Sequence, residues 1–422
     1  MRSKIIKNKK LLDIFKKLNE NEKAVCLFYS RQKEGWDKIL AWNPKEKFSY
    51  KISDKDFENN VRKFIEKETA KKRKIFGFFS YDLGYKIHKI KNTAKDDLEL
   101  PDILLLSFDE WITEETNNIK IHYQKDSSIK DIEKIFSRKD IAKKTTITSK
   151  EHENFKAQQS RAAYDKSYFT AKHHIKEGDI YQLNLTHRLH AKTKTASKEI
   201  FQKIIKNNKV GFLAYIKDTK FEILSASPER FIRIKGNKIE TSPIKGTRPR
   251  GKTKEEDLKL KNDLSKSKKE EAELNMITDL LRNDLGKFCK TGSVKVEEKR
   301  VLKKYNNVWH TLSKISGEID KNVNPIKGLI SMLPGGSITG CPKKRAIEII
   351  DKIEPTTRGI YTGIIGQITS KQDMDFSIAI RTIIKKGEDL YLQVGGGIVA
   401  DSKNKDEFEE TLHKAKSFMK IL

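Results

Sequence analysis

The order of the apolar segments from residue 180 onward constrains the fold more than any other feature. Strand-like segments follow one another at 180–189, 210–216, 222–228 and 231–235, and again at 363–368, 377–384 and 390–399. Parallel strands need long crossover connections, usually helices, and few such alternations are present. The pattern therefore predicts an α+β fold with largely antiparallel sheets.

The first 124 residues show the same character. An apolar run at 75–87 contains a glycine turn, a strongly apolar segment at 103–112 predicts a buried strand, and 119–123 alternates like an edge strand. Residues 125–155 are polar and rich in Lys, Ser and Thr. We predict a linker over 125–155 that divides an N-terminal segment, 1–124, from a C-terminal catalytic part, 156–422.

Helix signals lie in the C-terminal part. A helix is predicted over about 164–177, ended by Gly178. A charged helical stretch is predicted over 254–285, with Ser267 and Glu270 as a capping box, and a last helix over 405–421. The prolines and glycines of TSPIKGTRPRG (241–251) predict a loop.

Composition excludes some classes of protein. No apolar run reaches the length of a membrane-spanning helix, and the first twenty residues lack a signal core, so we expect a cytoplasmic protein with no membrane partner. Three widely spaced cysteines predict free thiols. The net charge of +29 suggests a nucleic-acid binder, but lysines are spread along the chain and no nucleic-acid-binding motif is present. We therefore expect no specific nucleic-acid partner and keep a basic nucleic-acid-binding protein only as a distant alternative.

The residues alone allow more than one role for each of two glutamates. Glu273 shares a helical face with Ile277, so its carboxylate points inward and needs a salt bridge, hydrogen bonds or a metal. Glu410 and Lys414 lie four residues apart and are typical of a solvated ion pair. The residues favour the salt bridge and the solvated pair.

Other motifs carry weaker signals. Two glycine clusters, LPGGSITG and VGGGIV, suit either tight turns or backbone N–H groups that bind an anion. Lys245 is either a desolvated nucleophile or an anion-binding charge, and His310 is either a structural or a catalytic histidine.

Taken together, ordered blocks of the chain resemble the chorismate-utilising enzymes. The blocks are GDIYQLNLT (178–186), SPERF (227–231), PIKGTRPRG (243–251), EEAELNMITDLLRNDLG (270–286), VWHTLS (308–313), LPGGSITGCPK (333–343), RGIYTGIIG (358–366), FSIAIRTI (376–383), GGGIVADS (395–402) and DEFEETLHKA (406–415), with GFFSYDLGY (77–85) in the N-terminal segment.

The resemblance implies a sandwich of two mostly antiparallel sheets flanked by helices, and it implies roles for residues at matching positions. Glu273 and Glu410 would bind Mg²⁺, which reverses both readings above. Glu229 would be a general acid. The substrate-binding residues would be Gln182, His310 at the ring of chorismate, Gly246 and Thr247 at its ring carboxylate, and Tyr361, Arg381, Lys414 and the backbone of Gly395, Gly396 and Gly397 at its second carboxylate.

Two positions distinguish branches of the family. Water-using members carry a lysine base where this chain has Gln182, which indicates an ammonia user. Anthranilate synthases have alanine in the block PIKGT, where this chain has Lys245. The resemblance is therefore closest to the aminodeoxychorismate synthase branch, and anthranilate synthase component I is the alternative.

That branch implies a covalent mechanism and a partner. Lys245 would attack C2 of chorismate while the 4-hydroxyl leaves with a proton from Glu229, and ammonia would then displace the lysine to give 4-amino-4-deoxychorismate, the precursor of p-aminobenzoate and folate. Neither Cys289 nor Cys341 lies in a glutaminase-like motif. We therefore expect ammonia from a separate glutamine amidotransferase subunit.

Overall fold

The computed structural model describes residues 1–18, 22–32, 34–54, 56–124, 132, 134–136, 138, 153–305 and 308–421. Most of the predicted linker at 125–155 lies outside the described residues. Within the described part of the chain, every helix is too short or too polar to cross a lipid bilayer.

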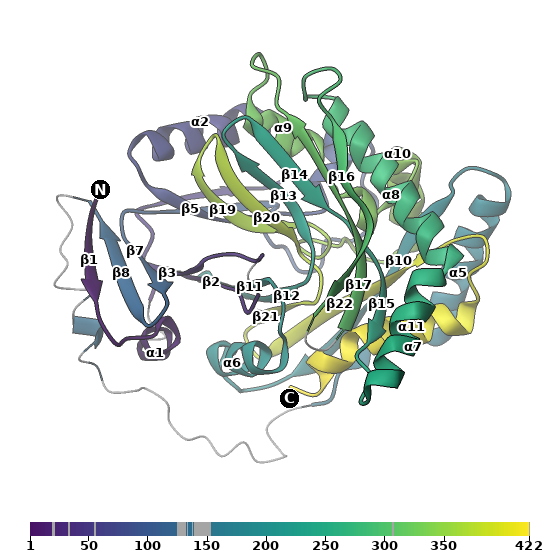
Figure 1. The fold of residues 1–422 in the computed structure, drawn as a ribbon, viewed down its shortest axis with the longest axis horizontal. Coiled ribbons are helices and arrows are strands. Elements are labelled where there is room, and N and C mark those ends of the chain that lie inside the picture. Colours follow the sequence, from purple (N-terminus) through teal and green to yellow (C-terminus); the bar gives the residue numbers. More distant parts are fainter. Residues whose placement is uncertain are drawn as a thin grey trace.

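Two large sheets form the centre of the molecule (Figure 1). Along its main path the first has the order β1-β8-β7-β3-β2-β11-β12-β21-β22-β10-β18, and β9 pairs with β10. Its strands are β1 (Arg2–Ile6), β2 (Val25–Tyr29), β3 (Lys38–Trp42), β7 (Trp111–Glu115), β8 (Asn118–Tyr123), β9 (Lys156–Ala157), β10 (Gln182–Lys192), β11 (Phe212–Lys217), β12 (Glu222–Ser227), β18 (Gly340–Cys341), β21 (Thr382–Lys386) and β22 (Asp389–Ile398).

The second sheet has the order β15-β17-β14-β13-β20-β19-β5-β6-β4, with β16 paired to β17. Its strands are β4 (Glu46–Tyr50), β5 (Lys74–Phe79), β6 (Ile103–Phe108), β13 (Arg230–Lys235), β14 (Lys238–Ser242), β15 (Ile244–Pro249), β16 (Lys295–Lys304), β17 (Val308–Glu318), β19 (Ile364–Ser370) and β20 (Asp373–Ile378). The paired strands of both sheets run antiparallel, as predicted.

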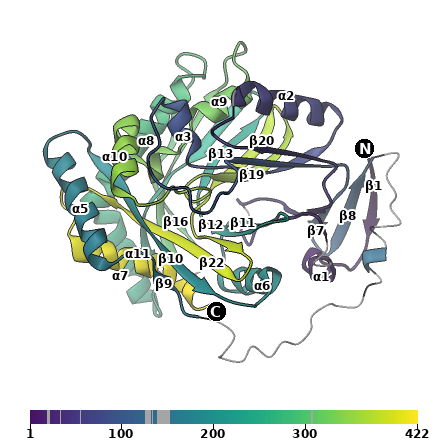
Figure 2. The same cartoon turned by 180° about the vertical axis from the view of Figure 1, so that it is seen from behind.

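Helices lie outside the two sheets (Figures 1 and 2). They are α1 (Leu11–Lys17), α2 (Phe57–Ala70), α3 (Leu83–Ile87), α5 (Arg161–Lys176), α6 (Ser197–Asn207), α7 (Lys254–Lys266), α8 (Lys268–Gly286), α9 (Pro325–Ser331), α10 (Lys343–Ile353) and α11 (Asn404–Met419), with a 3₁₀ turn, η1 (Gly336–Ile338). Helices α2 and α9 lie against the second sheet, whereas α1, α6 and α11 lie against the first.

Strand periodicity produces the layers. Successive side chains of a strand point to opposite faces of its sheet. In β6, Ile103 and Leu105 pack under the helices of the second sheet, while Leu104 and Leu106 enter an aromatic layer between the two sheets. Residues from the predicted N-terminal segment supply central strands of both sheets, since β2 pairs with β11 and β5 pairs with β19.

The segment predicted as a loop at 241–251 is in large part an edge strand, which corrects that prediction. Strand β15 pairs with β17, and the register shifts between Lys245 and Thr247. Gly246 makes the bulge at φ +83°, and Pro249 ends the strand. Edge strands and bulges tolerate the residues that made the sequence look like a loop.

The strand predicted over 377–384 is also different in the structure. It is two strands in two sheets: β20 ends at Ile378 in the second sheet, and β21 begins at Thr382 in the first. Arg381 lies at the crossing with φ +53°. An apolar run alone does not reveal such a break, because both halves are buried.

The helix predictions hold with small changes. The charged stretch is two helices that meet at Ser267, whose side chain accepts a hydrogen bond from the Glu270 N–H as the capping box predicts. In α11 the buried face is Glu407, Thr411, Ala415 and Phe418. In the sequence, Phe408, Leu412, Ala415 and Met419 form an apolar stripe along this helix. The buried face is rotated from that stripe, so the side chain of Glu407 is buried.

Candidate active site

Lys245 lies on β15 and faces the glycine strand of the other sheet. Its Nζ is 3.5 Å from the carbonyl oxygen of Ser337, and a Cβ atom added to Gly397 would lie 3.8 Å from the same Nζ. The Thr311 hydroxyl on β17 donates a hydrogen bond to the Lys245 carbonyl. The bulge thus presents the lysine between the two sheets from a backbone that β17 fixes.

Glu229 lies next to the lysine, between β12 and β13. Its side chain is buried, and the Ser337 hydroxyl donates to its Oε1 at 2.9 Å. Burial raises the pKa of Glu229 to about 7, although Ser337 and the nearby Lys245 lower it. A carboxyl group with this pKa is well placed to donate a proton near neutral pH.

Gln182 enters the same space from β10. It is buried, its amide nitrogen lies 2.6 Å from a Cβ added to Gly397, and its Oε1 has no hydrogen-bond partner among the described residues. Strand β10 pairs with β22 so that Thr186, Leu185 and Asn184 lie opposite Gly395, Gly396 and Gly397, respectively. The glycines let side chains approach the β22 backbone closely.

Thr247 and His310 are cross-strand neighbours on β15 and β17. His310 Nδ1 is 2.8 Å from the Thr247 hydroxyl and 3.4 Å from the carbonyl oxygen of Gly246. Burial, with a further contribution from Arg381, lowers the pKa of His310 to about 4, so its imidazole is neutral at pH 7.

Arg381 carries a positive charge into the interior, and its guanidinium makes no hydrogen bond or ion pair to another described residue. Burial lowers the pKa of its guanidinium. A small cavity of about 40 Å³ reaches both Arg381 and His310. A guanidinium in this state is a ready partner for a carboxylate.

Carboxylates of α8 and α11 gather around lysines. Lys414 Nζ is 2.8 Å from Glu410 and 3.0 Å from the Gly395 carbonyl oxygen. Burial raises the pKa of Glu273, with Glu410 among the further contributors, against the lowering effect of Lys245 and Lys269. Burial also acts on Glu410, but Lys414 and other lysines leave its pKa lowered. Glu410 of the predicted metal pair therefore acts electrostatically on Glu273.

The predicted pair is not a preassembled metal cage. The described residues contain no group of three or more His, Cys, Asp or Glu side chains arranged for a metal ion. Mg²⁺ usually keeps several waters and takes one or two carboxylates, so a pair of glutamates remains sufficient in chemical terms.

Tyr361, which was also predicted to bind a substrate carboxylate, lies beside Arg358. It is buried, and burial raises the pKa of its phenol, whereas the nearby Arg358 lowers it. Its backbone N–H bonds to the carbonyl oxygen of Arg358. The Thr362 N–H bonds to the Ala379 carbonyl, which links the Tyr361 turn to the crossing segment that carries Arg381.

The sequence analysis missed three residues here. Ser337 joins Glu229 and Lys245, and nothing in its glycine-rich block distinguishes it from a turn residue. Glu270 and Glu407 each lie three residues before a predicted metal ligand, on the same helical face. That repeated spacing is a signal which could have found them. Glu270 Oε2 is buried without a partner, and Glu407 accepts a hydrogen bond from the Ser402 hydroxyl at 2.6 Å.

Comparison with known proteins places this geometry in a family. Residues 24–420 match the family described as chorismate binding enzyme. The chain is 35% identical over 362 residues to the aminodeoxychorismate synthase component 1 of Bacillus subtilis, covering 82% of this chain and 76% of that protein. It is 31% identical over 415 residues to the anthranilate synthase component 1 of Aquifex aeolicus, covering 94% of this chain and 84% of that protein.

The fold agrees with these sequence relationships. The crystal structure of anthranilate synthase component I from Streptococcus pneumoniae superposes with a TM-score of 0.82 at 26% identity, over 93% of this chain and 92% of that one. The predicted two-sheet architecture is confirmed. The chain belongs to the chorismate binding enzyme family.

Proposed function

We propose that the chain is an aminodeoxychorismate synthase component 1, which converts chorismate and ammonia to 4-amino-4-deoxychorismate. The observation that carries the proposal is the position of Lys245, between the Ser337 carbonyl and Gly397 and within electrostatic reach of the buried Glu229. A lysine at this place gives the site a nucleophile beside a proton donor.

The charges around the site suit a dicarboxylate substrate. Arg381 has no ionic partner among the described residues, and its planar fork matches a carboxylate. Lys414, held at the Gly395 carbonyl, supplies a second cation near the backbone of Gly395–Gly397. The neutral imidazole of His310 offers a flat surface and a hydrogen bond rather than a charge.

The proposed chemistry begins with the neutral amine of Lys245, which forms a bond to C2 of chorismate. The ring double bonds shift, the C4–O bond breaks, and Glu229 gives its proton to the oxygen, which leaves as water. Ammonia then bonds to C4, the double bonds shift back, and the C2–N bond to Lys245 breaks. The proton that ammonia loses restores Glu229, and the enolpyruvyl group stays on the product.

Gln182 fits the ammonia step. Its unpartnered Oε1 is buried at the glycine strand, and an amide oxygen accepts a hydrogen bond from ammonia but is too weak a base to activate water. A glutamine amidotransferase subunit is the proposed source of the ammonia.

Mg²⁺ is proposed as the cofactor, held by Glu273 and Glu410. The unpartnered Oε2 of Glu270 and the raised pKa of Glu273, to which burial and the charge of Glu410 contribute, fit a hard cation that prefers oxygen donors. When bound, the metal would offset the negative charge of a substrate carboxylate.

Anthranilate synthase is the second candidate, because relatives with that activity are similar at nearly the same identity. Incubation with chorismate, Mg²⁺ and ammonium, followed by mass analysis, separates the two. The proposal predicts a non-aromatic product that has gained nitrogen and kept the enolpyruvyl group. A fluorescent aromatic product formed with release of pyruvate would overturn it.

A further inference from the structure

The glycine-rich block 333–340 forms a turn, η1 and its flanks, that touches both groups of the proposed reaction. The Ser337 hydroxyl donates to Glu229 Oε1 at 2.9 Å, and the carbonyl oxygen of the same residue lies 3.5 Å from Lys245 Nζ. Ser337 is buried. One residue thus contacts the proton donor through its side chain and the nucleophile through its backbone.

We propose that Ser337 is a positioning residue that sets the geometry between Glu229 and Lys245, and that Arg358 holds Ser337 in place. The inference rests on the proposed function for the roles of Glu229 and Lys245, whereas the contacts themselves do not depend on it.

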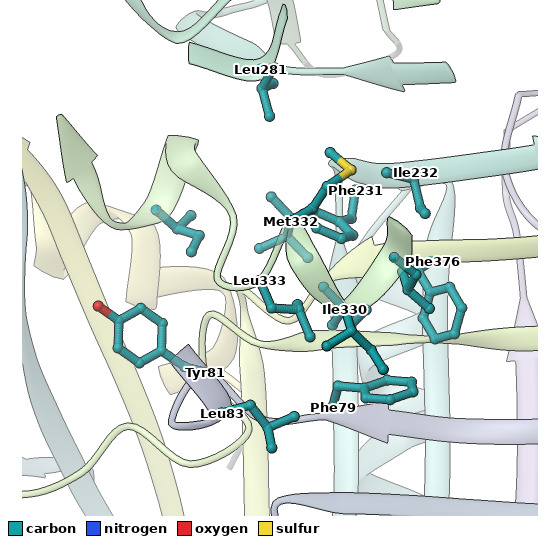
Figure 3. Close-up of a cluster of buried hydrophobic side chains, with 14 of the residues drawn as sticks. Phe79, Tyr81, Leu83, Phe231, Ile232, Leu281, Ile330, Met332, Leu333 and Phe376 are labelled. Carbon is teal, nitrogen blue, oxygen red and sulfur yellow. The ribbon is translucent and has the colours of Figure 1, made fainter. Parts of the chain in front are cut away.

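Apolar packing anchors one side of the turn. Met332 and Leu333, which precede the glycines, belong to a buried cluster with Phe231 and Tyr81 (Figure 3). On the α8 side, a Cβ atom added to Gly336 would lie 2.4 Å from the Leu280 side chain. The packing of Met332 and Leu333 therefore fixes where the segment enters the site, and position 336, just before Ser337, has little room for a side chain.

Arg358 anchors the other side of the turn by binding Ile338, the residue that follows Ser337. The guanidinium is fully buried, and Nη1 donates to the Ile338 carbonyl oxygen at 3.0 Å. Nη2 donates to the Asn184 carbonyl of β10 at 2.6 Å, two residues from Gln182. The turn and the glutamine strand are therefore tied to one side chain.

The remaining donors of Arg358 are also used. Nε and Nη2 bond to the two oxygens of Glu354 at 2.8 and 2.7 Å, and Nη1 reaches the Thr362 hydroxyl at 3.5 Å. The guanidinium also lies 4.5 Å from the centre of the Tyr81 ring. Five donors in a planar fork meet four partners, an arrangement that the three donors of lysine cannot reproduce.

The carboxyl group of Glu229 reports on this arrangement. The charged residue that acts on it is Lys245, and its other stabilising contacts are the Ser337 hydroxyl and the backbone of Ile244. Loss of the Ser337 hydrogen bond removes a donor to the carboxylate, so Glu229 holds its proton to higher pH. A substitution that only destabilises the fold elsewhere leaves the Ser337 donor in place, so it does not shift the titration of Glu229.

The test is a double-substitution cycle on the titration of Glu229. Infrared difference spectra of the substrate-free chain follow its carboxyl band, assigned by loss of the band in Glu229→Gln. Ser337→Ala is expected to raise the titration midpoint by about one pH unit. Arg358→Lys is expected to raise it in the Ser337 background and to leave it unchanged in the Ser337→Ala background. Ser331→Ala, which removes a hydrogen bond to Gly328 within helix α9 just before the block, is the control with no shift.

An unchanged midpoint in Ser337→Ala overturns the inference. Equal shifts from Arg358→Lys in both backgrounds overturn the role of Arg358, because they mean that it does not act through Ser337. If Arg358→Lys does not fold, Glu354→Gln takes its place in the cycle, since it removes the charge that holds the guanidinium and keeps the shape.

Kinetics separate this inference from the proposed function. Ser337→Ala is expected to lower kcat roughly tenfold with little change in KM for chorismate, because the substrate carboxylates are bound elsewhere. A chain that makes anthranilate while its Glu229 midpoint shifts as expected refutes the proposed function and keeps the contact. If the chain makes aminodeoxychorismate but the Glu229 midpoint does not shift in Ser337→Ala, the proposed function stands and the role of Ser337 is refuted.

Discussion

The amide nitrogen of Gln182 lies 2.6 Å from the place where a Cβ atom of residue 397 would be. Gly397 therefore provides the space in which the Gln182 side chain reaches the site. The neighbouring Gly395 differs, because its added Cβ would lie 2.7 Å from the Leu185 carbonyl oxygen, which is backbone and moves less easily.

Gly397→Ala is expected to keep the fold and to lose activity. The flexible end of Gln182 moves aside, and a displacement of about 1 Å at a reacting group costs on the order of 100-fold in rate. Activity with ammonium and a thermal melt measure the two effects. Gly286→Ala, at a helical position with open space, is the control; a Gly397→Ala enzyme as active as that control would contradict the role of Gly397.

The burial of Glu229 predicts a pH-dependent cost in stability. Its pKa is about 7 in the fold, against 4.5 for the free side chain, so the folded chain binds the extra proton between these values. Its contribution to the free energy of unfolding therefore falls from pH 4.5 to pH 7, by roughly 3 kcal/mol in total.

Glu229→Gln should remove this dependence. Relative to the unsubstituted chain, the variant is expected to gain stability as the pH rises from 5 to 8, while its activity is lost. Urea unfolding at several pH values measures the difference. A difference that stays constant across this range would mean that Glu229 is not a buried carboxyl group with a raised pKa.

The proposed metal site predicts matched losses from two helices. Glu273→Gln and Glu410→Gln should each abolish turnover and weaken Mg²⁺ binding measured by calorimetry. Glu409→Gln, next in sequence and paired only loosely with Lys405 at 4.0 Å, is the control and should behave like the parent chain. Undiminished activity in EDTA would refute the metal assignment.

A buried ion pair joins helix α8 to helix α10. Lys343 Nζ lies 2.6 Å from Asp284, and both side chains are almost fully buried. Asp284 also contacts Lys287, whereas Lys343 has no second carboxylate among the described residues. Asp284→Asn therefore leaves the buried ammonium of Lys343 without a carboxylate and should lower the free energy of unfolding in urea by about 3–5 kcal/mol. Lys343→Met should lower it by less. The reverse order would contradict this reading of the pair.

Most strands could be predicted from short apolar segments, the antiparallel fold class from the scarcity of crossover helices between them, and the start of helix α8 from its capping box at Ser267. The crossing at Arg381 could not, since the apolar run continues on both sides of the break and only three-dimensional pairing separates β20 from β21. Strand β15 was hidden by glycine and proline, which an edge strand with a bulge accepts.

The candidate site was predicted mainly through motif resemblance. Local pattern favoured a solvated pair for Glu410 and Lys414, and the structure contains that ion pair, yet it also brings Lys414 to the Gly395 carbonyl. Ser337 and Arg358 could not be found from sequence, because their contacts join residues that are distant in the chain, such as Glu229 and Ser337.

The covalent role of Lys245 is the claim on which the choice between the two synthases depends. If Lys245 supplied only charge, Lys245→Arg would keep much of the activity, whereas a nucleophile fails in that variant because guanidinium stays protonated. Lys245→Ala should also lose most aminodeoxychorismate formation.

The most direct measurement is intact-protein mass spectrometry after chorismate and Mg²⁺ are added without ammonia. We predict an added mass equal to chorismate less water, mapped by proteolysis to Lys245, lost in Lys245→Ala and discharged when ammonium is supplied. Full formation of the same product by Lys245→Ala would contradict the mechanism and the assignment to aminodeoxychorismate synthase.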